Sequence, residues 1–216
     1  MSIPFLDIHL GKYLKAADNG DLFRHPLYLF YLVIGWSFVL TPLAVLFKGG
    51  SEVLRALDSD YETAGIKVLT VLAFLIALAV SLVIAYLAVV FWRDRAMRMR
   101  NITQMQSDFF VLPVWVHLIR SMGEWLGLVI AIALTTAGVI VFLFGLHGAF
   151  TSDYYQLETL GYALLALVGL PVLGVLSGYL VVFLHRIFAE GINVFLSMAT
   201  NLSAIRSDTR NIANRR

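Results

Sequence analysis

Four long stretches of this chain contain no charged residue, and this feature limits its fold more than any other. An α-helix rises about 1.5 Å per residue and the hydrocarbon layer of a membrane is about 30 Å thick, so roughly 20 apolar residues suffice for one span. We therefore predict an all-α, membrane-embedded four-helix bundle that forms a single transmembrane domain over residues 1–216. Its spans are expected at about 26–47, 68–92, 125–146 and 160–184.

The composition agrees with lipid as the solvent of most of this surface. Hydrophobic residues make up 60% of the chain, charged residues only 14%, and the mean hydropathy is +0.83. A water-facing surface would need far more charge. The chain also lacks cysteine, which excludes disulfides, thiolate metal sites and thiol nucleophiles.

The distribution of positive charge predicts the orientation. Most of the 16 Lys and Arg residues fall in the N-terminal segment, in the loop after the second span and in the tail, whereas the two other loops hold only Lys48, Arg55 and Lys67. Positive residues in short loops are retained inside, so both termini are expected to be cytoplasmic. Within residues 1–25 we expect a short interfacial helix, because residues 4–17 place their apolar side chains on one face. Trp92 and Trp125, at predicted span ends, are expected at headgroup level.

Helices 2 and 4 are predicted to continue into the cytoplasm as arms covering 93–112 and 185–216, because neither Gly nor Pro follows Trp92 or Leu184. The second arm carries apolar residues at heptad spacing. These are Val181, Phe188, Phe195 and Leu202 in one row, and Leu184, Gly191, Met198 and Ile205 in the other. Such a seam packs against the other arm of the same chain, against a helix of another chain, or on lipid headgroups. Four arginines below the second span are expected to contact headgroups. They are Arg93, Arg95, Arg98 and Arg100.

Close helix packing is predicted in the fourth span, where Gly174 and Gly178 form a GxxxG motif that lets another helix approach. Pro42 and Pro171 are expected to kink the first and fourth spans, since neighbouring helices can satisfy the backbone groups that a proline leaves unbonded.

Residues that could carry chemistry are scarce. The span centres hold no ionisable side chain, and the nearest cluster is His117, Arg120 and Glu124, which share one face of the helix that follows Pro113. Their spacing predicts an interfacial charge cluster or, alternatively, a gate. His25 and His185 also lie at inner span ends, where facing imidazoles can ligate haem, but no propionate-binding pattern accompanies them. We predict no catalytic residue, cofactor or metal. Membrane insertion by itself favours arginines at the cytoplasmic end of a span. These arginines therefore do not indicate nucleic acid as a partner.

The tail also resembles the closing segment of an uncharacterised family of small bacterial inner-membrane proteins. The resemblance covers about 25 residues, and Gly191 and Asn193 depart from the apolar run of that family. It implies a bacterial inner membrane and no particular activity. It rests on Arg186-Ile187-Phe188-Ala189-Glu190, Val194-Phe195, Met198, Asn201-Leu202 and Ile205-Arg206.

Together these features predict a non-catalytic integral membrane subunit or scaffold rather than an enzyme. Its expected partners are membrane lipids and either further copies of itself or the subunits of a larger membrane complex. An oligomeric ion channel or transport component is the alternative, and a haem-binding redox subunit is a further alternative.

Overall fold

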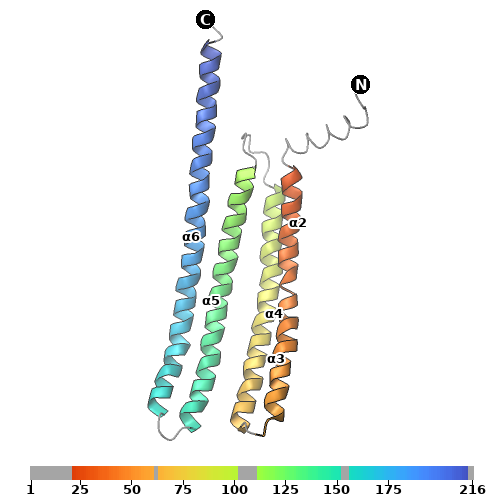
Figure 1. Ribbon diagram of the computed structural model, residues 1–216, viewed down its shortest axis with the longest axis vertical. Helices are drawn as coiled ribbons and strands as arrows, with labels where there is room; N and C mark the ends of the chain where they lie inside the picture. The colour runs from red at the N-terminus through yellow and green to blue at the C-terminus, as the bar shows by residue number, and fades with distance from the viewer. Residues whose placement is uncertain (1–20, 61–62, 102–110, 152–155, 214–216) are drawn as a thin grey trace, which may run out of the picture.

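The computed structural model describes residues 21–60, 63–101, 111–151 and 156–213, and every regular element in these ranges is a helix. The elements form a long, narrow bundle (Figure 1). They are α2 (Asp21–Ser37), α3 (Leu40–Asp58), α4 (Ala64–Asn101), α5 (Val111–Thr151) and α6 (Gln156–Ala213). The predicted interfacial helix at 4–17 and residues 102–110 of the first predicted arm lie outside the described residues.

Four helical segments are long and apolar enough to cross a membrane, with α2 and α3 counted as one interrupted segment. The all-α class and the four long apolar helices are therefore confirmed. The helices are also longer than the predicted spans. Helix α4 continues past Trp92 to Asn101, and α6 continues past Leu184 to Ala213. Figure 1 shows that α6 extends well beyond the ends of the other described helices.

The helices pair as two antiparallel hairpins. The combined α2 and α3 pack along α4, and α5 packs along α6, while α4 and α5 form the smaller contact between the hairpins. At the end of the bundle where α4 begins, this contact places Gly65 against the ring of His147 in α5. At the opposite end it consists of large aromatic side chains.

Pro42 explains why the first helix is interrupted. A proline has no N–H to bond the carbonyl four residues earlier, and its ring clashes with that carbonyl, which here belongs to Phe38. The helix accordingly breaks at Phe38 and Val39, where the Val39 N–H donates to the Trp36 carbonyl at 3.0 Å in a tighter turn. The predicted kink is thus a complete break. Pro171, in contrast, lies within α6, which continues through it.

The first helical segment also ends later than predicted, because α3 runs through Gly49 and Gly50 to Asp58. A Cβ on Gly49 would lie 2.7 Å from the Phe74 ring of α4, so glycine lets the two helices approach closely here. The Lys67 ammonium donates to the Leu57 carbonyl at 2.9 Å, which satisfies one of the carbonyls that a helix end leaves unbonded.

The contact between α5 and α6 depends on glycine in both helices. A Cβ on Gly178 would collide with the Gly127 carbonyl oxygen, and a Cβ on Gly127 would collide with that of Gly178. Gly174, the other glycine of the GxxxG motif, faces Ala131 and Leu134 of α5. The motif therefore lies in a contact within this chain.

Replacing Gly178 with alanine should separate α5 from α6 and destabilise the protein. We expect Gly178→Ala to lower the free energy of unfolding by about 1–3 kcal/mol, the usual cost of overpacking. Thermal unfolding of the detergent-purified chain measures this change. Gly161→Ala is the matched control, since no atom lies within 4 Å of a Cβ at that position of α6, and alanine is the better helix former. Equal melting temperatures for the two variants would contradict this contact.

Candidate functional site

The core of the described structure is concentrated where α2, α4 and α5 meet, near the end of α4. One face of α4 contributes most of it, with residues spaced three or four apart. The fully or almost fully buried residues are Tyr31, Ala88, Trp92, Ala96, Met99, Val114 and Trp125.

Aromatic rings hold this region together. The Trp92 ring lies 5.5 Å from that of Tyr31 and 6.2 Å from that of Trp125, and Phe38 meets Trp125 edge-on at 5.0 Å, all between ring centroids. Such pairs stabilise a core beyond their buried area. Trp92 and Trp125 thus pack in the core of the bundle and not on its outer surface. Their burial joins the first hairpin to α5.

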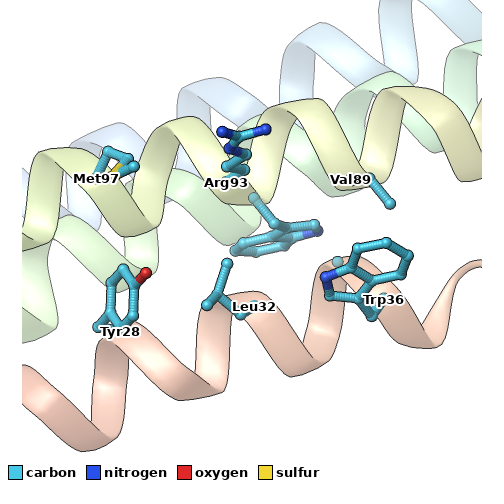
Figure 2. Close-up of a pocket in the computed structure, with 8 residues that line it drawn as sticks. Tyr28, Leu32, Trp36, Val89, Arg93 and Met97 are labelled. Carbon is cyan, nitrogen blue, oxygen red and sulfur yellow. The ribbon is translucent and has the colours of Figure 1, made fainter.

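A pocket opens beside this core between α2 and α4, with a volume of about 300 Å³. Figure 2 shows Tyr28, Leu32 and Trp36 on α2 facing Val89 and Met97 on α4. Apart from Arg93, its lining is mostly apolar and aromatic, so it is suited to a hydrocarbon chain more than to a polar reactant.

Charged residues form a second cluster next to the aromatic one. Glu124 of α5 accepts a hydrogen bond from Arg95 of α4 and forms an ion pair with Arg186 of α6 at 3.5 Å. The Arg95 guanidinium also lies 5.0 Å from the centroid of the Phe91 ring. Arg95 and Glu124 are only 19% and 24% exposed, so a single carboxylate connects three helices in a partly buried setting.

The cluster predicted from sequence is therefore rearranged. His117, Arg120 and Glu124 all line one cavity, but Glu124 pairs with arginines of other helices and not with Arg120. His117 forms a hydrogen bond through Nδ1 with the Tyr31 hydroxyl at 3.0 Å. Spacing along one helix could not reveal partners that come from α2, α4 and α6.

Among the four arginines assigned to lipid headgroups, Arg95 differs from the prediction, because it points inward to Glu124. Arg93 is exposed, and Arg98 is largely exposed while pairing with Asp94 at 2.9 Å. The side chain of Arg100 lies outside the described part of the chain.

The cavity has a volume of about 510 Å³ and lies among α4, α5 and α6 at the end of the bundle where α4 ends. Arg95, Arg186 and Glu190 belong to it although the charge cluster predicted from sequence omitted them. It is lined by Arg95, Arg98, His117, Arg120, Ser121, Glu124, Arg186 and Glu190.

The predicted seam on α6 is uncovered. Beyond residue 185 its large side chains are 57–74% exposed, and none of the described helices packs over them. They are Phe188, Phe195, Met198, Leu202 and Ile205.

Two of the histidines considered for haem form hydrogen bonds through Nδ1, an arrangement that is compatible with ligation through Nε2. His117 bonds Tyr31, and His185 donates from Nδ1 to the Val181 carbonyl at 2.8 Å. The side chain of His25 lies outside the described residues. Within the described ranges no three His, Asp or Glu side chains are grouped so as to hold a metal ion.

No family model, curated protein or solved structure matches this chain. The resemblance of the tail to a bacterial membrane family therefore stays a prediction.

Removing the central ring of the aromatic cluster should unfold much of the structure. Trp92 is fully buried, so we expect Trp92→Ala to cost about 3–5 kcal/mol through the cavity that it leaves. Trp36→Ala makes the same chemical change on a side chain that is 62% exposed, and should cost no more than about 0.5 kcal/mol. Circular dichroism during thermal unfolding compares the two. Similar losses would show that the core lies elsewhere.

Proposed function

We propose that this chain is a non-catalytic integral membrane subunit or scaffold that assembles, with itself or within a larger membrane complex, through its spans and through α6. The observation that carries the proposal is the uncovered stripe of α6, defined by Phe188, Phe195, Met198, Leu202 and Ile205. Apolar side chains that repeat every seven residues along a helix are typical of packing against another helix.

The surface of the bundle supports placement in lipid. Large apolar side chains are more than half exposed around the helices, including Val33, Leu75 and Val168. Water disfavours such a surface, whereas hydrocarbon solvates it at no cost. The glycine contact between α5 and α6 supports the same placement, because small residues dominate the contacts of transmembrane helices.

The arginines support a cytoplasmic location for the end of the bundle where α4 ends. Arg95, Arg98, Arg120 and Arg186 gather there, and positive charge is retained on the inner side. A bacterial inner membrane is part of the proposal and rests on the resemblance of the tail alone.

The length of α6 supports its role as an arm. Its 58 residues correspond to about 87 Å of helix, against about 30 Å of hydrocarbon. With residues 160–184 in the bilayer, the stripe would lie in the cytoplasm, where an exposed apolar row favours a partner. Glu124 is held by two arginines of other helices, so its carboxylate links α4, α5 and α6.

Site-specific crosslinking tests the stripe as an assembly surface. Because the chain has no cysteine, Phe195→Cys introduces a single thiol on the stripe, to which a photoreactive maleimide is attached in native membranes. We expect adducts several-fold more abundant than from Asn193→Cys. That control is also exposed and lies at nearly the same height but about 200° around the helix.

The mass of the adduct distinguishes the two forms of assembly. Twice the mass of the chain indicates self-association, and another mass indicates a different subunit. Equal or absent adducts at both positions would contradict the proposal.

Labelling with a membrane-impermeant maleimide tests the orientation. Asn193→Cys should react only in inverted membrane vesicles, and Leu157→Cys, which is 89% exposed at the opposite end of the bundle, only in intact cells. The reverse pattern, or reaction of both from the same side, would refute the proposed orientation.

A further inference from the structure

The cavity among α4, α5 and α6 contains more positive charge than its own carboxylates balance. Four of its eight lining residues are arginines, and only Glu124 and Glu190 are acidic. Glu124 is already shared by Arg95 and Arg186, and Arg98 pairs with Asp94. An excess of positive charge therefore surrounds a space of about 510 Å³.

Arg120 is the residue whose bonding is least complete. None of the described residues offers it a carboxylate within ion-pair distance, and its Nε is buried without a hydrogen-bond partner. The Nε of Arg95 is buried and unbonded as well. A guanidinium only donates hydrogen bonds, and a buried donor without an acceptor is unfavourable. These guanidinium donors thus lack a hydrogen-bond acceptor, and an anionic oxygen is the acceptor that suits them.

We propose that this cavity binds a phosphate group, held by Arg120 together with the guanidinium groups of Arg98 and Arg186. The planar guanidinium presents paired N–H donors that match two phosphate oxygens. Arginines converge from three helices, so the group would also bridge both hairpins. The volume exceeds that of a bare phosphate ion and leaves room for the substituent of a phosphate ester.

Two kinds of ligand carry such a phosphate group: an anionic phospholipid, in its headgroup, and soluble phosphate. The lipid source rests on the proposed membrane placement, in which the cavity lies near the inner headgroups. The pocket chemistry itself does not depend on that placement.

Lipid retention by the purified full-length chain tests the lipid source. The detergent-solubilised protein is mixed with phosphatidylglycerol and phosphatidylcholine and examined by native mass spectrometry. We expect phosphatidylglycerol to be retained preferentially and Arg120→Gln to reduce its retention about tenfold. Arg206→Gln is the matched control, because it removes the same charge from an exposed position of α6 outside this cavity, and should leave retention nearly unchanged.

Inorganic phosphate tests the soluble source in the same preparation. Phosphate should raise the melting temperature of the native chain above that in chloride of equal ionic strength, and this rise should be lost in Arg120→Gln. An effect of lipid alone assigns the site to a headgroup, and an effect of phosphate alone assigns it to a soluble ligand.

The proposal is overturned if neither probe depends on Arg120, or if Arg206→Gln has the same effect. Should Arg120→Gln fail to fold, Arg120→Lys decides by the same criterion, because it keeps the charge and loses the paired donors. Crosslinking through Phe195 does not involve Arg120, so failure of this site and failure of the proposed assembly are distinguishable.

Discussion

The carboxylate of Glu124 is the interaction on which the arrangement of the two hairpins depends. It lies on α5 and is shared by Arg95 of α4 and Arg186 of α6. In a partly buried setting an ion pair is strengthened by the lower dielectric, but removing one partner leaves the other charge without compensation. Arg95 also contacts the Phe91 ring, so the charged cluster and the aromatic cluster stabilise each other. The end of the bundle where α4 ends is therefore more precisely specified than the rest of the helices.

Much of the fold was predictable because long apolar stretches without charge are a strong signal in the sequence. Four charge-free stretches identify four helices, and only helices satisfy backbone polar groups within a single segment in lipid. The details that escaped prediction depend on packing. Pro42 indicated a kink, yet the position of the break at Phe38 follows from the carbonyl four residues earlier. The first span was expected to end near residue 47, but α3 continues to Asp58, with Gly49 packed closely against the Phe74 ring.

The candidate site was predictable only in part. His117, Arg120 and Glu124 were recognised as a cluster, but spacing along α5 does not show which helices lie opposite. Trp92 and Trp125 were assigned to headgroup level because aromatic residues at span ends often lie there. The small residues Ala88 and Ala96, one turn on either side of Trp92, were the available signal that this face of α4 is buried. The stripe of α6, by contrast, was visible as a heptad repeat and is exposed in the structure.

A double-mutant cycle on Arg95 and Glu124 tests the central claim most directly. Arg95→Gln, Glu124→Gln and the double variant are compared with the native chain by their free energies of unfolding in detergent. If this pair joins the hairpins, the two changes are strongly non-additive, with a coupling energy of about 1 kcal/mol or more. Additive effects, within about 0.3–0.5 kcal/mol, would mean that the hairpins are held together by other contacts.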